Sequence, residues 1–153
     1  MFHFINILIP KTQKLQFLKM TSSNCQGRRG ALIAFEGLDR SGKSTQSRML
    51  VESLNKIGKQ SQHMCFPDRT TPIGKILGQY LSRTDYVLND RAIHLLFTAN
   101  RFENLTKINE LLCSGVNVIV DRYSFSGIVY SAVKKGMYVV EFIIDILQNA
   151  LVK

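Results

Sequence analysis

A chain of 153 residues corresponds to a single domain, and no apolar run in it reaches the ~20 residues that a membrane-spanning helix needs. The formal net charge is +9, but the basic residues are dispersed and not interleaved with aromatic ones, so we expect no nucleic-acid partner; an arginine-rich phosphate pocket explains the charge equally well. Cys25, Cys65 and Cys113 are far apart and indicate a reducing compartment with inert free thiols.

Residues 1–28 are interpreted as an extension that precedes the domain and is disordered. The stretch 1–19 is apolar and basic, contains no acid and is broken by Pro10. A mitochondrial targeting segment is one alternative, although no arginine precedes Arg28, and a secretory signal is another, although no basic region precedes the apolar residues. We therefore expect a cytoplasmic protein, with a mitochondrial location as the alternative.

Strands and helices alternate along the rest of the chain. In order, we expect a strand over 30–36, a helix over 43–57 ended by Gly58, a strand over 61–66, a loop over 66–72, a helix over 73–82, one long helix over 89–112 ended by Gly115, a strand over 116–120 and a helix over 123–135. This alternation predicts an α/β fold with a parallel sheet flanked by helices. Ligands then bind at the carboxyl ends of the strands.

Residues 37–44 read GLDRSGKS, which is a complete G-x-x-x-x-G-K-S motif between a predicted strand and a predicted helix. Gly37 and Gly42 permit backbone angles that let successive N–H groups point at an anion. Lys43 would reach the β- and γ-phosphates of ATP, and the Ser44 hydroxyl would bind Mg²⁺. The predicted ATP site comprises Gly37, Leu38, Asp39, Arg40, Ser41, Gly42, Lys43, Ser44 and Thr45. The motif predicts a phosphate-binding loop of the P-loop NTPase type.

Charged residues follow the other strands at the same edge. Asp121 ends an apolar strand, where it is either a carboxylate that helps to hold Mg²⁺ or the N-cap of the next helix; the complete phosphate loop favours the metal. Arg122 beside it can bind a phosphate bidentately. Arg69 is either a solvated turn residue or a second phosphate ligand.

Phe97 and Arg101 are four residues apart and share one face of the predicted helix over 89–112. Their spacing alone favours a core phenylalanine beside an arginine whose charged end reaches solvent. The alternative is a ring that stacks on a nucleotide base, with an arginine that donates to the base carbonyl.

Four segments together resemble thymidylate kinases: FEGLDRSGKSTQ at 35–46, FPDR at 66–69, HLLFTANRFE at 94–103 and DRYSFSG at 121–127. The resemblance covers residues 29–137. It implies a nucleoside monophosphate kinase fold and the reaction of dTMP with ATP and Mg²⁺ to give dTDP and ADP. It also implies a homodimer through the family's dimer face.

The resemblance assigns substrate roles to individual residues. Phe97 would stack on thymine and Arg101 would donate to its ring carbonyl. Arg69 and Arg122 would hold the dTMP phosphate, and Asp39 would meet the deoxyribose 3′-hydroxyl. The pocket-lining residues it implies are Phe66, Gly127 and Tyr130.

The resemblance also implies the catalytic and metal-binding groups. Arg40 is similar to the catalytic arginine that one subclass of the family carries inside the phosphate loop. With it, Lys43, Asp39 and Arg122 are the expected catalytic residues, and Ser44 and Asp121 the expected metal ligands.

Residues 138–153 have no recognisable counterpart in the family, which continues through a further strand, a flexible lid and closing helices. We interpret the chain as a truncated or alternatively spliced form whose tail can form an amphipathic helix over 138–152. The alternative to kinase activity is therefore a catalytically impaired isoform that binds nucleotide, or a partner, without turnover.

Overall fold

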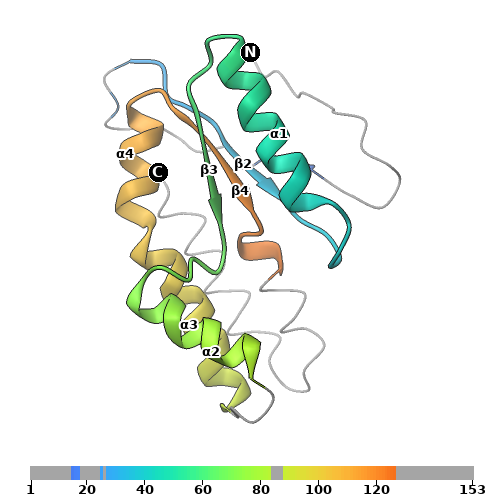
Figure 1. Cartoon of the computed structure of the whole chain (residues 1–153). Helices are drawn as coiled ribbons and strands as arrows, with labels where there is room; N and C mark the ends of the chain where they lie inside the picture. The colour runs from blue at the N-terminus through green and yellow to red at the C-terminus, as the bar shows by residue number, and fades with distance from the viewer. Residues whose placement is uncertain (1–14, 18–24, 26, 84–87, 127–153) are drawn as a thin grey trace.

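Four strands form one sheet in the computed structural model, which describes residues 15–17, 25, 27–83 and 88–126 (Figure 1). The elements in chain order are β1 (Leu15–Phe17), β2 (Leu32–Phe35), α1 (Lys43–Lys56), β3 (Ser61–Cys65), α2 (Pro72–Ser82), α3 (Asp90–Glu103), α4 (Leu105–Cys113) and β4 (Asn117–Asp121). The order of strands across the sheet is β1-β2-β4-β3.

Three of the strands run parallel to one another. β4 lies between β2 and β3, and Asp121 is in register with Phe35 on one side and with Cys65 on the other. The carboxyl ends of β2, β3 and β4 therefore meet at one edge of the sheet. The parallel sheet expected from the sequence is confirmed. In such sheets ligands bind at this edge.

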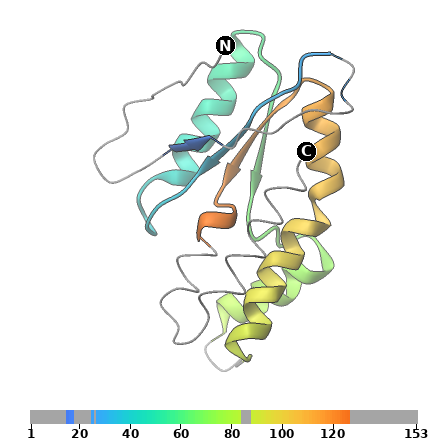
Figure 2. The same ribbon diagram turned by 180° about the vertical axis from the view of Figure 1, so that it is seen from behind.

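Different helices cover the two faces of the sheet. The core on one face combines strand residues with α4; its buried members are Leu32, Ala34, Met64, Phe66, Ile108, Leu112, Val118, Val120 and Tyr123. On the other face, Nε2 of His63 lies 2.9 Å from Oγ of Ser47 in α1. Because neighbouring residues of a strand point to opposite faces, α1 and α4 lie on opposite sides of the sheet (Figures 1 and 2).

The long helix expected over 89–112 is divided in the structure into α3 and α4, with Asn104 between them. The Asn104 backbone N–H donates a hydrogen bond to the Arg101 carbonyl at 3.2 Å. Its side-chain amide donates one to the Asn100 carbonyl, also at 3.2 Å. A side chain that replaces a backbone donor in this way interrupts the regular helix. The single helix was therefore a wrong prediction at this residue.

The glycines predicted to end two helices do so. Gly58 follows α1 with φ 74° and Gly115 follows α4 with φ 80°, a left-handed conformation that favours glycine. α2 and α3 pack against each other beyond the carboxyl end of β3 (Figure 1). They therefore border the edge of the sheet where the phosphate loop lies.

Residues 15–17 belong to the sheet. β1 pairs antiparallel with β2, and Leu15 is in register with Phe35 at the carboxyl end of that strand. The expectation that residues 1–28 are a disordered extension before the domain is wrong for this segment. The physical reason is that the edge of β2 that faces away from β4 would otherwise be unpaired, and an extended segment satisfies its backbone groups.

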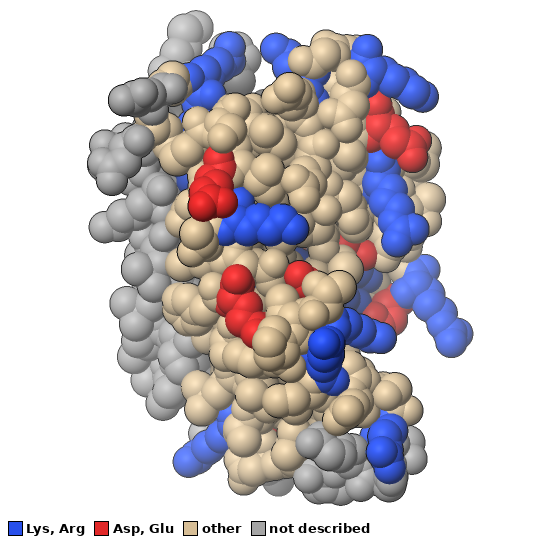
Figure 3. Space-filling view, turned by 60° about the vertical axis from the view of Figure 1, so that its left-hand side comes forward, with Lys and Arg blue, Asp and Glu red and all other residues tan. Residues whose placement is uncertain are grey.

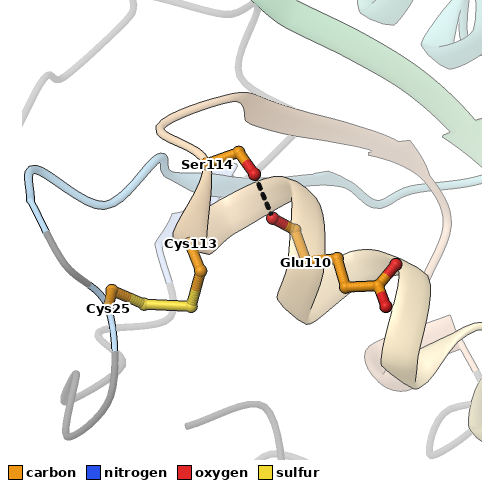
Figure 4. Close-up of a disulfide and its surroundings, with 4 residues drawn as sticks. All are labelled: Cys25, Glu110, Cys113 and Ser114. Atoms are coloured by element: carbon orange, nitrogen blue, oxygen red, sulfur yellow. Dashed lines mark hydrogen bonds between the residues drawn. A yellow bond between two sulfur atoms is a disulfide. The ribbon is translucent and has the colours of Figure 1, made fainter.

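Cys25 and Cys113 form a disulfide, although 88 positions separate them in the chain (Figure 4). Beside it, the Gly30 N–H donates to the Leu112 carbonyl at 2.8 Å, so the segment before β2 runs along the end of α4. The expectation of three free thiols is wrong for these two cysteines, because the fold brings them together. Cys65 is free and exposed.

Several expectations fall outside the described residues. Of the helix expected over 123–135 the structure describes residues 123–126, of which 124–126 are helical, and the amphipathic helix expected over 138–152 lies outside the described residues. Among the residues that are described, no helix is both long and apolar enough to cross a membrane. The face shown in Figure 3 carries basic and acidic side chains next to each other instead of one continuous basic surface.

Candidate active site

The loop between β2 and α1 has the backbone geometry of a phosphate-binding loop. Gly42 has φ 86°, and a Cβ at that position would meet no atom within 4 Å. The glycine is therefore required by the backbone conformation and not by lack of space. α1 begins at the next residue, and the Gln46 N–H donates to the Gly42 carbonyl at 2.9 Å. The positive end of the helix is thus directed into the loop, where it favours an anion.

Lys43 is folded into this loop and is only 5% exposed. Its Nζ donates to the Leu38 carbonyl and lies 3.4 Å from the Ser41 hydroxyl. Burial lowers the pKa of Lys43, as does the charge of Arg122, while nearby carboxylates oppose the shift. The ammonium group is therefore held inside the loop by the Leu38 carbonyl oxygen and the Ser41 hydroxyl oxygen. The oxygens of a bound phosphate could take the place of these two acceptors.

Ser44 and Asp121 meet across the loop. The Ser44 hydroxyl donates to Oδ2 of Asp121, which joins the first turn of α1 to the carboxyl end of β4. A hydroxyl and a carboxylate form a small oxygen set, and Mg²⁺ is commonly held by one or two protein oxygens together with waters and phosphate oxygens. Within the described ranges, no group of three or more His, Cys, Asp or Glu residues could hold a metal ion. The two side chains therefore fit Mg²⁺ bound jointly with a nucleotide.

Arg122 is held from two sides. One terminal nitrogen pairs with Oδ1 of Asp39, and the other donates to the Ser126 hydroxyl at 2.9 Å. Its backbone adopts φ 64°, and its N–H donates to the Phe35 carbonyl at 2.9 Å. A non-glycine residue with this φ is uncommon, and such positions concentrate at functional sites. The strained turn directs the guanidinium toward the phosphate loop.

Glu36 maintains this turn, a role that the sequence motifs do not reveal. Its Oε1 accepts a hydrogen bond from the Tyr123 N–H at 2.9 Å, and its Oε2 accepts one from the Ser126 hydroxyl. Arg122 is therefore linked to two carboxylates, directly to Asp39 and through Ser126 to Glu36. The one feature of the sequence that could have indicated this role is the position of Glu36, an acidic residue at the end of a buried strand.

The side chains expected to bind the second substrate lie on α3 and on the loop after β3. Phe97 is half-buried, whereas Arg101 is buried and donates to the Thr98 hydroxyl at 3.1 Å. The ring of Phe66 packs edge-on against Tyr123, with centroids 5.4 Å apart, so it belongs to the core at the base of this region.

The structure thus brings Asp39, Lys43, Ser44, Asp121 and Arg122 together at one end of the sheet. Arg40 lies in the same loop, is exposed and has φ 60°. Arg69 is exposed in the loop after β3. Gly127 and Tyr130 lie outside the described residues.

Comparison with known proteins identifies related sequences. A family model described as thymidylate kinase matches residues 35–152. The matched range continues past residue 137, beyond which we expected the sequence to diverge from the family. The matched range covers well over half of the chain and includes the whole phosphate loop.

Individual relatives agree with the family model. The chain is 51% identical over 109 residues to the thymidylate kinase of Homo sapiens, an alignment that covers 71% of this chain and 51% of the human protein. It is 53% identical over 106 residues to that of Schizosaccharomyces pombe, covering 69% of this chain and 50% of that protein. The chain spans about half the length of the curated relatives it matches.

Solved structures show the same fold. The thymidylate kinase of Candida albicans superposes with a TM-score of 0.66 at 43% identity, covering 80% of this chain and 54% of that chain. The thymidylate kinase of Ehrlichia chaffeensis gives a TM-score of 0.64 at 32% identity, and the superposition covers 80% of this chain and 67% of that chain.

Proposed function

This chain belongs to the thymidylate kinase family, and we propose that it transfers the terminal phosphoryl group of ATP to dTMP, giving dTDP and ADP. The observation that carries the proposal is the convergence of Lys43, Ser44, Asp121 and Arg122 at the carboxyl edge of the parallel sheet. A phosphate loop alone would suit many nucleotides. The family match supports dTMP as the second substrate.

On the ATP side, the loop N–H groups and the N-terminus of α1 would bind the phosphates, and Lys43 would neutralise charge on the β- and γ-phosphates. Ser44 and Asp121 would hold Mg²⁺, which would offset the negative charge of the phosphates. Arg40 is exposed and located in the loop, where it can approach the transferred group. The protein provides no nucleophile in this scheme.

On the dTMP side, Arg122 and Arg69 would hold the monophosphate, and Asp39 would accept a hydrogen bond from the 3′-hydroxyl. A dTMP phosphate oxygen attacks the γ-phosphorus of ATP, and the bond from that phosphorus to the bridging oxygen of ADP breaks. Catalysis then rests on positioning the two substrates and neutralising their charge.

The decisive experiment is ADP release by the purified protein with ATP and Mg²⁺, measured with and without dTMP. We expect release to depend on dTMP and to fall about a hundredfold or more in Lys43→Ala, because the loop loses its charge. Lys56→Ala changes an exposed lysine at the far end of α1 and should match the wild type. A protein that binds dTMP without releasing ADP would instead fit a role in nucleotide binding.

Base selectivity tests the substrate more finely. Arg101 can only donate hydrogen bonds, so it needs a carbonyl where cytosine carries an amino group. Together with Phe97 as a stacking surface, it should favour dTMP over dCMP. Equal protection against thermal unfolding by dCMP and dTMP would contradict the proposed base pocket.

We also propose a homodimer. Exposed apolar side chains on α2 and α3 support it, namely Ile76, Leu81, Leu95 and Phe102. Sedimentation of the wild type beside Leu95→Glu tests it, because a charge at a buried interface should release monomers. A wild type that sediments as a monomer would contradict the dimer.

The cytoplasmic location stays a prediction.

A further inference from the structure

Asn100 fixes the turn that carries Arg69. This residue of α3 is fully buried, and its Oδ1 accepts a hydrogen bond from the Asp68 N–H at 2.7 Å. Its amide nitrogen donates to the Asp68 carbonyl at 3.0 Å and also lies 2.8 Å from the Thr71 hydroxyl. One side chain thus holds both backbone groups of Asp68 and reaches the other end of the turn, across 32 positions of the sequence.

Glu103, one turn further along α3, holds the same segment. Its Oε2 accepts a hydrogen bond from the Thr71 hydroxyl at 2.5 Å and one from the Asn100 amide at 3.1 Å. Its Oε1 accepts from the Ile73 N–H at 3.2 Å, in the first turn of α2. Burial acts to raise the pKa of Glu103, but these hydrogen bonds outweigh it and lower the pKa, so the carboxylate stays ionised at neutral pH.

α2 closes the turn from the other side. A Cβ on Gly74 would lie 1.6 Å from the Asp68 carbonyl oxygen, so the helix and the turn touch without space for a side chain. The Thr71 hydroxyl also caps α2 by accepting from the Gly74 N–H at 3.1 Å. Arg69 is therefore carried on a backbone that α2 and α3 hold from both sides, while its own side chain is exposed.

We infer that Asn100 and Glu103 are positioning residues for the monophosphate of the nucleotide substrate, and that they act through Arg69 without touching the substrate. The inference rests on the proposed function, in which Arg69 binds the dTMP phosphate. When the backbone that carries a long side chain is already rigid, less conformational entropy is lost as the side chain binds an anion. Loosening the turn therefore weakens dTMP binding and leaves the ATP site intact.

A double-mutant cycle tests the route through Arg69. We expect Asn100→Ala to raise KM for dTMP about tenfold, with kcat and KM for ATP changed less than twofold. In an Arg69→Ala background the same substitution should add almost nothing, because the group through which it acts is gone. An unchanged KM for dTMP, a loss confined to kcat, or effects that multiply in the double variant would each overturn the inference.

Two further variants keep the test decisive. Glu103→Ala changes an exposed side chain, so it serves if Asn100→Ala does not fold, and it should show the same dependence on Arg69. Asn55→Ala is the matched control. The Asn55 side chain also holds one residue by both backbone groups, because it donates to the Ser61 carbonyl at 3.1 Å and accepts from the Ser61 N–H at 2.8 Å, far from α3. It should leave both KM values unchanged.

Hydrogen exchange separates the failure of this inference from the failure of the proposed function. A wild type with neither dTMP binding nor dTMP-dependent ADP release would refute the proposed function. Amide exchange at residues 68–71 of the unliganded protein then decides the inference. Asn100→Ala should accelerate it about tenfold relative to the wild type and to Asn55→Ala. Unchanged exchange would overturn the positioning role.

Discussion

Asp39 and Arg122 form an ion pair across the mouth of the site, although 83 positions separate them in the chain. Asp39 is largely exposed, so the pair contributes little to stability, within about 1 kcal/mol. Its effect is geometric. One arginine bridges the phosphate loop and the turn after β4, because its second nitrogen bonds to Ser126.

Arg122→Lys should therefore impair dTMP binding without impairing folding. A lysine keeps the charge but cannot pair with Asp39 and bond to Ser126 in the same fixed geometry. We expect KM for dTMP to rise about tenfold or more and the melting temperature to stay within a few degrees. Arg91→Lys, an exposed position in the first turn of α3, is the control. Unaltered kinetics in Arg122→Lys would count against a bidentate role.

Ser44→Ala should raise the Mg²⁺ concentration needed for half-maximal activity. The substitution removes one of the two oxygens that face each other at the start of α1, and leaves the Asp121 carboxylate. We expect roughly a tenfold shift in a Mg²⁺ titration of ADP release at saturating ATP and dTMP. Ser114→Ala, at the far end of the sheet beside the disulfide, should titrate as the wild type does (Figure 4). Identical Mg²⁺ curves for all three proteins would remove Ser44 from the metal site.

Reduction of the disulfide between Cys25 and Cys113 should destabilise the protein. A link between residues 88 positions apart restricts the unfolded chain strongly, and such links typically contribute about 2–4 kcal/mol. Cys113→Ser should lower the free energy of unfolding by this amount and abolish its dependence on a reducing agent. The exposed Cys65 provides the control, since Cys65→Ser should leave both unchanged. A wild type whose urea midpoint is the same with and without reductant would contradict the prediction.

Stability should decrease with rising pH above about 10 because of Tyr123. Burial raises the pKa of Tyr123 to about 12, while the nearby charge of Arg101 acts weakly in the other direction. An unfolded tyrosine ionises near pH 10, so the contribution of this residue is complete below pH 10 and is lost as the pH rises to 12. The unfolding free energy of the wild type, measured relative to that of Tyr123→Phe, should fall by about 1 kcal/mol between pH 9 and 11. A difference that stays constant over this range would contradict the burial of the hydroxyl.

Local patterns determined the elements nearest to the chemistry. The phosphate loop lies within eight consecutive residues between a buried strand and a helix, and Gly58 and Gly115 end their helices as expected. The run of strands and helices determined the parallel sheet, because crossovers between parallel strands bring their carboxyl ends to one edge. For that reason Asp121 could be placed beside the loop from the sequence, and its contact with Ser44 agrees.

Only the tertiary structure decided the contacts that depend on distant partners. Three contacts join segments that share no sequence pattern. They are the pairing of β1 with β2, the disulfide between Cys25 and Cys113, and the hydrogen bonds between Asn100 and the backbone of Asp68. Glu36 and Asn104 are similar cases, because a single polar residue can cap, bridge or face solvent, and its neighbours in the chain do not determine which. Periodicity specifies which face of an element is buried, whereas a hydrogen bond or a disulfide requires an exact approach in space, which exists only after the whole chain has packed.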